Sequence, residues 1–195
     1  MNLNAFFESE LDEHLDVSSK TRAILSEPFA ALVALTTDVV RAGGKIMLFG
    51  NGGSAADAHN IATEFAVRYK TDRAAIPAIG LTTDGGVLTA IGNDFGFDQL
   101  FARQIEALGK PGDLAIGIST SGRSPNVLEG LKTARRMDIR TAALGGGTGG
   151  DMIDLVDLAL IVPSKTTARI QEMHILLGQM LCGAVEVELG LVPAP

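Results

Sequence analysis

The chain has 195 residues, of which 46% are hydrophobic and 20% are charged, and its formal net charge at pH 7 is −7. This length fits one domain, or one domain with an added helical arm. The negative charge argues against a general nucleic-acid binder. No apolar run approaches the roughly 20 residues that span a bilayer, and the polar N-terminus lacks a signal-peptide core. The single cysteine, Cys182, lies in an apolar helical pattern, so we expect a buried free thiol in a cytoplasmic protein.

The first 43 residues predict a helical arm. Helices are expected over residues 6–15 and 19–41, and the second carries an apolar stripe. Pro28 falls inside that second pattern and is expected to break or kink it. Because the arm precedes the first strand, we expect residues 1–43 to serve in oligomerisation and residues 44–195 to form the main domain.

From residue 45 onward, predicted strands and helices alternate. The strands are expected at about 45–49, 77–81, 113–118, 140–145 and 158–162. The helices are expected at about 54–69, 84–91, 97–108, 125–137, 149–155 and 166–189. This alternation predicts an α/β fold, a three-layer αβα sandwich with a five-stranded parallel sheet. The glycine-rich stretch 145–150 is expected to form a mobile loop.

Two strand–turn–helix units carry candidate ligand-binding turns. The first has the sequence Gly50-Asn51-Gly52-Gly53-Ser54. Its glycines let the backbone approach a ligand, and the start of the next helix presents free N–H groups to an anion. Ser54 is expected to be the helix N-cap. The second turn, residues 119–124, is rich in hydroxyl groups and precedes Pro125. Because both turns leave the carboxyl ends of parallel strands, they predict a site for a phosphorylated small molecule.

Neither turn matches a nucleotide-binding motif. The Walker pattern needs a lysine after its last glycine, and both turns lack that lysine. The dinucleotide fingerprint needs a third glycine, which is missing from the first turn. A phosphate monoester is therefore a better candidate than a nucleotide cofactor.

These motifs resemble the sugar isomerase (SIS) domain family, and within it the phosphoheptose isomerases. The similar segments are 50–58, 81–84, 88–94, 117–122 and 169–172. With their spacing they cover nearly the whole chain from about residue 43. The resemblance implies a homotetramer with sites at subunit interfaces. It also implies conversion of sedoheptulose 7-phosphate to D-glycero-D-manno-heptose 7-phosphate, an early step toward heptose in bacterial lipopolysaccharide and other surface polysaccharides.

The resemblance further assigns roles to particular residues. Glu64 matches the catalytic base of the family. The candidate substrate-binding residues are Asn51, Gly52, Gly53, Ser54, Asn93, Asp94, Ser119, Thr120, Ser121, Ser124 and Gln171. The four hydroxyl residues among 119–124 are expected to hold the phosphate, and the others to contact the sugar or line its pocket.

Two zinc ligands that the resemblance implies are missing. Members of the family commonly hold zinc with two histidines, a glutamate and a glutamine. The glutamate and glutamine match Glu64 and Gln171, but the histidine positions hold Asn60 and Gln179. His59 is rotated by about 100° from Asn60 on a helix, so it is a poor replacement. The residues favour a site without zinc, and zinc on Glu64 and Gln171 stays open.

The missing histidines also affect the predicted chemistry. Aldose–ketose isomerisation needs a base for the carbon acid and a proton donor for the oxygen. Gln179 cannot transfer a proton, although it can donate a hydrogen bond to a developing oxyanion. His174, His59 and Asp94 are the candidates to supply the proton. We expect an isomerase; the alternative is a non-catalytic phosphosugar-binding or regulatory protein similar to the DnaA initiator-associating protein.

Overall fold

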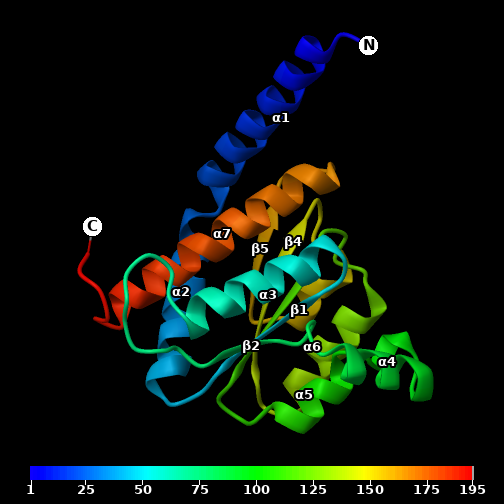
Figure 1. The fold of residues 1–195 in the computed structure, drawn as a ribbon, viewed down its shortest axis with the longest axis vertical. Helices are drawn as coiled ribbons and strands as arrows, with labels where there is room; N and C mark the ends of the chain where they lie inside the picture. The colour runs from blue at the N-terminus through cyan, green and yellow to red at the C-terminus, as the bar shows by residue number, and fades with distance from the viewer. Residues whose placement is uncertain (195) are drawn as a thin grey trace.

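A computed structural model describes residues 1–194 and contains one five-stranded sheet between two layers of helices (Figure 1). The strand order is β2-β1-β3-β4-β5, and all neighbouring strands pair in parallel. The strands are β1 Ile46–Gly50, β2 Ala78–Gly80, β3 Leu114–Ser119, β4 Arg140–Gly146 and β5 Leu158–Val162. The predicted three-layer αβα sandwich is confirmed.

The central strands are short apolar runs that are buried on both faces. Every residue of β1 and β3 is buried, as expected for parallel strands that helices cover on both sides. Strand β2 lies at the edge of the sheet and is only partly buried. Each end of a predicted strand lies within one residue of the observed end.

Helices divide between the two faces of the sheet. On one face α2 (Ser26–Arg41), α3 (Gly53–Ala66) and α7 (Thr167–Glu188) enclose one hydrophobic core. On the other face α5 (Ala102–Leu108) and α6 (Pro125–Arg136) enclose a second core. Helix α4 (Gly85–Asp94) lies at the rim beside the 3₁₀-helix η1 (Phe97–Gln99). Figure 1 shows α3 and α7 side by side across the first face.

Two predicted helices take a different form. The helix expected over 97–108 is split into η1 and α5, and the helix expected over 149–155 is the 3₁₀-helix η2 (Gly150–Leu155). The loop expected over 145–150 begins later, because β4 continues through Gly146. Local apolar spacing does not distinguish a continuous α-helix from two short helical pieces.

The N-terminal arm bends at a different residue from the one expected. Helix α1 (Leu3–Ile24) runs without a break through residues 16–18 and meets α2 at Leu25, where the two helices bend by 69°. Pro28 was expected to break a helix, but it lies in the first turn of α2, where its missing N–H has no helical partner to lose. Helix α2 packs on α7 and β5, whereas the start of α1 projects from the body (Figure 1). The functional division at residue 43 stays a prediction.

Within the described residues, no single helix has the length and apolar character that a membrane crossing requires, and only the bent pair of α1 and α2 meets both criteria together.

Candidate active site

The two predicted turns lie next to each other at the carboxyl edge of the sheet. Strands β1 and β3 are paired, and Gly50 stands opposite Ile118. The side chains of Asn51 and Asn126 exchange two hydrogen bonds of 2.8 Å, which join the first turn to the start of α6. Asn126 is buried and was not among the predicted site residues. The sequence pattern therefore placed both turns correctly but missed the amide pair that connects them.

The second turn presents hydroxyl groups at the start of α6. Ser119 is buried at the end of β3, and its Oγ lies 3.1 Å from Oγ of Ser124 in a hydrogen bond. Ser124 is the N-cap of α6, but its side chain makes no capping bond. The first N–H groups of α6 therefore have no side-chain cap, as an anion site at a helix start requires.

Gly122 fixes the shape of this turn. Its φ angle is +65°, and a Cβ atom at this position would overlap the backbone carbonyl of Gly149. The N–H of Met152 also donates to the Gly122 carbonyl at 3.1 Å. The turn is thus held against the loop after β4 by contacts that only glycine permits.

Helix α3, which follows the first turn, begins at Gly53, one residue before the expected start at residue 54. The N-cap of α3 is Gly52, with φ of +55°, and Ser54 is a buried residue inside the helix. The prediction of Ser54 as N-cap was wrong because Gly53 already has helical geometry. A Cβ atom at Gly53 would overlap the amide of Gln171, so this amide lies against the first turn.

Two cavities adjoin the turns. One of about 380 Å³ lies between the first turn and helix α4, and its lining includes Asn51, Gly52 and Thr82. The other, of about 350 Å³, lies beside the second turn and is lined by Thr120, Ser121, Arg123 and Lys165 among others. Arg123 and Lys165 are cations that the sequence analysis did not place in the site. Both suit a ligand that carries a phosphate.

Asn93 and Asp94 lie at the end of α4. Both are exposed, and Asn93 Nδ2 donates to Asp94 Oδ1 at 2.7 Å. Neither residue lines the two cavities. Their predicted contact with the sugar stays a prediction.

Glu64 lies at the far end of α3 from the two turns. It follows Ser54 by ten residues, which corresponds to about 15 Å along a helix. Gln179 Nε2 donates to Asn60 Oδ1 at 2.7 Å and to Glu64 Oε1 at 3.4 Å. The structure thus brings Glu64 together with the two residues that replace the expected histidines. Gln171 precedes Gln179 by about two turns of α7, which separates the two residues by about 12 Å along the helix axis.

The residues around Glu64 do not fit a zinc ion. Zinc sites use imidazole, thiolate and carboxylate ligands, whereas Asn60 and Gln179 offer amides. The residues that the structure describes contain no group of three or more His, Cys, Asp and Glu side chains that could hold a metal. Ligand atoms of a tetrahedral zinc lie about 3.4 Å apart, but the two amide tips are 2.7 Å apart in a hydrogen bond.

His174 is excluded as a proton donor to the substrate. It is completely buried, and its Nε2 lies 3.0 Å from the carbonyl oxygen of Gly145. Burial lowers the pKa of His174 to about 4, and the hydrogen bond to Gly145 opposes this only in part. The side chain is therefore neutral and sealed from solvent at neutral pH. His59 is exposed on α3 and Asp94 at the end of α4, and both stay candidates.

Asp57 is a titratable residue that the sequence analysis missed. It precedes Asn60 by three residues and Glu64 by seven, so the three share one face of α3. Its Oδ2 atom is buried without a hydrogen-bond partner. Desolvation by burial raises the pKa of Asp57 from 3.8 to about 6.

Replacing Asp57 by asparagine is expected to stabilise the protein above about pH 6 and to have no such effect near pH 4. The folded chain keeps this proton between pH 3.8 and about 6, where the unfolded chain has lost it. The charge therefore costs stability as pH rises through this window. Because the side chain is only half-buried, we expect a gain of about 1 kcal/mol, or roughly 2–4 °C in Tm. Thermal unfolding at both pH values checks this, and an equal Tm gain at both would contradict it.

The parallel sheet and the paired turns at its carboxyl edge together define an SIS domain. Comparisons with known proteins agree with this assignment. The profile of the SIS domain family matches residues 11–146. The phosphoheptose isomerase of Paramagnetospirillum magneticum is 53% identical over 95% of this chain and 97% of its own length. That of Roseiflexus sp. is 48% identical over 91% and 90% of the two lengths.

Solved structures give the same result. The phosphoheptose isomerase of Neisseria gonorrhoeae superposes with a TM-score of 0.90 at 40% identity, covering 95% of this chain and 99% of that one. That of Francisella tularensis gives a TM-score of 0.92 at 32% identity, covering 95% and 98%. The chain belongs to the phosphoheptose isomerase branch of the SIS domain family. The resemblance found in the sequence and the prediction of an isomerase are confirmed.

Proposed function

We propose that this protein converts sedoheptulose 7-phosphate to D-glycero-D-manno-heptose 7-phosphate, for heptose in lipopolysaccharide or other bacterial surface polysaccharide. The observation that carries the proposal is the pair of turns at adjacent strand ends, one of them lined by hydroxyl groups at a helix start. The phosphate of the sugar would accept hydrogen bonds from Ser119, Thr120, Ser121 and Ser124 and from the first N–H groups of α6. Arg123 and Lys165 add positive charge nearby.

Glu64 is the proposed base. In this reaction a carboxylate takes the proton from the carbon next to the carbonyl group, and an enediolate forms. The same carboxyl group then returns the proton to the neighbouring carbon. The Nε2 group of Gln179 donates to Glu64, and it could donate to the enediolate oxygen only in place of its bond to Asn60. His59 and Asp94 remain the candidates to supply the proton to the enediolate oxygen.

The proposed site needs a second copy of the chain. Ser54 and Glu64 are separated by about 15 Å along α3, whereas the extended backbone of a seven-carbon sugar spans only about 8 Å at roughly 1.3 Å of advance per bond. The separation along α3 thus exceeds the length of the sugar backbone, which favours a site in which the phosphate turn and Glu64 come from different copies. We propose a homo-oligomer, a tetramer as in the family, in which the phosphate turn of one copy faces Glu64 of another.

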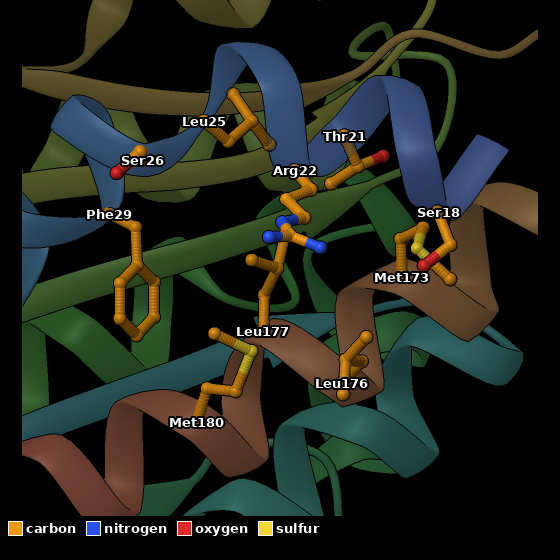
Figure 2. Close-up of a pocket in the computed structure, with 10 residues that line it drawn as sticks. All are labelled: Ser18, Thr21, Arg22, Leu25, Ser26, Phe29, Met173, Leu176, Leu177 and Met180. Atoms are coloured by element: carbon orange, nitrogen blue, oxygen red, sulfur yellow. The ribbon is translucent and has the colours of Figure 1, made fainter.

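Exposed apolar surface on the arm supports this assembly. Leu3, Phe6, Phe7, Leu11 and Leu15 of α1 are all exposed, and Phe7 is 60% exposed. An apolar groove of about 340 Å³ lies between the α1–α2 bend and α7. Leu25 and Phe29 line it from the bend and Met180 lines it from α7 (Figure 2). Surfaces of this kind mark protein–protein contacts. A cytoplasmic location, which we also propose, agrees with the buried free thiol of Cys182.

Replacing Phe7 and Leu11 by glutamate is expected to dissociate the oligomer. Two charges would replace apolar side chains on the face that we propose to be covered, and burying an unpaired charge costs several kcal/mol. Light scattering after size exclusion would report a smaller species, and kcat would fall with it because the site is shared. The exposed Asp12 on the same helix gives a control, Asp12→Asn, that should leave the mass unchanged. A wild-type monomer with full activity would contradict the proposal.

The function itself is tested by incubating the purified chain with sedoheptulose 7-phosphate and following the heptose 7-phosphate by NMR. Turnover is the expected result. Binding of the sugar phosphate without turnover would instead favour the non-catalytic alternative.

A further inference from the structure

The polar group between α3 and α7 contains one carboxylate and two amides. Gln179 donates through one nitrogen to both Asn60 Oδ1 and Glu64 Oε1, at 2.7 and 3.4 Å. Glu64 is therefore the only side chain of the three that carries charge. The second oxygen of its carboxylate is left for a ligand or for a residue of another copy.

The position of Gln179 is fixed by close packing of the two helices. A Cβ atom at Gly178 would overlap the side chain of Ile61, so the helices approach each other more closely than a larger residue would allow. Cys182 Sγ donates to the carbonyl of Ile61 at 3.8 Å. One turn further along α7, Glu186 forms an ion pair of 2.8 Å with Arg73, and both side chains are buried. The packing of the two helices thus places Gln179 next to Glu64, and its side chain reaches the carboxylate through the 3.4 Å hydrogen bond.

We propose that this site binds no zinc ion and that Gln179 acts instead as a positioning residue, holding the Glu64 carboxylate in place for proton transfer. A zinc ion would have to separate the amide tips of Asn60 and Gln179. From these two residues it would gain only neutral oxygen donors, which zinc binds less well than imidazole. A single carboxylate with two amides is a weak zinc site by ligand type and by charge. The part of the proposal that concerns Gln179 rests on the proposed function; the part that concerns the metal does not.

The metal is tested by zinc content. The purified wild-type chain and an Asn60→His/Gln179→His double variant would each be incubated with zinc chloride, desalted and measured by inductively coupled plasma mass spectrometry. We expect less than about 0.1 zinc per chain in the wild type and close to one in the double variant, since two imidazoles complete a common ligand set. About one zinc in the wild type would overturn the proposal. A double variant as empty as the wild type would also overturn it, because the two amides would then not be the cause.

The positioning role is tested by Gln179→Leu, which has a similar volume and no hydrogen-bond donor. We expect kcat to fall by roughly 10-fold, the equivalent of one modest hydrogen bond to a charged group, while KM and Tm stay close to the wild-type values. Wild-type turnover in the presence of a strong chelator is also expected. An unchanged kcat in the leucine variant, or turnover that the chelator abolishes, would overturn the proposal. If the wild type gives no turnover at all, the proposed function fails, and the zinc measurement still decides the question of the metal.

Discussion

Replacing Glu64 by glutamine is expected to lower kcat by roughly 10²–10⁴-fold with sedoheptulose 7-phosphate, the usual contribution of a single general base. Glutamine has nearly the same shape, and its carbonyl oxygen can still accept the bond from Gln179 Nε2. The variant should therefore fold and bind substrate, but it cannot remove a proton from carbon. KM is expected to change little. Exchange of the substrate proton with deuterium oxide, followed by NMR, should be lost in parallel with turnover.

Glu106→Gln is the matched control for this variant. Glu106 lies on the surface of α5 in an ion pair of 3.1 Å with Arg103, and surface pairs contribute little to stability. Its removal should leave both kcat and Tm unchanged. If Glu64→Gln retained kcat within about threefold of the wild type, Glu64 would not be the base.

Removing the hydroxyl groups of Ser119 and Ser124 together is expected to raise KM for the sugar phosphate by roughly 10²–10⁴-fold. A hydrogen bond to a charged group contributes about 1.5–3 kcal/mol, and two such bonds would be lost. Because these hydroxyls bond to each other at 3.1 Å, the double Ser→Ala change leaves neither without its partner. The effect on folding should therefore be small, and the loss should be confined to binding.

Ser9→Ala serves as the control for the double variant. Ser9 is exposed on α1, and its hydroxyl donates to the carbonyl of Phe6 at 2.8 Å. Initial rates over a range of substrate concentrations separate KM from kcat. A double variant with wild-type KM would show that the phosphate is held elsewhere.

Much of the fold could be predicted from the sequence because the strands are continuous apolar runs. Five such runs, separated by helical patterns, specify a parallel sheet between helices almost by themselves. The bend between α1 and α2 was misplaced because Pro28 is tolerated in a first helical turn, whereas Leu25, a buried apolar residue at the observed bend, is not a residue type that signals a helix end.

The site was predictable where backbone conformation matters and not where distant helices meet. The glycines and serines of the two turns identify themselves by type and spacing. The meeting of Gln179 with Asn60 and Glu64 follows only from the pairing of α3 with α7. The burial of His174 under Gly145 depends on the third dimension as well. Asp57 was missed because its raised pKa comes from desolvation, which no sequence motif marks.

A crystal of the protein grown with sedoheptulose 7-phosphate would show directly where the sugar's charged end binds. We predict that the phosphate lies within hydrogen-bond distance of Ser119 and Ser124 at the start of α6, with the carbonyl end of the sugar next to Glu64 of a neighbouring copy. A phosphate found away from residues 119–124, with that turn in contact only with water, would contradict the proposed site.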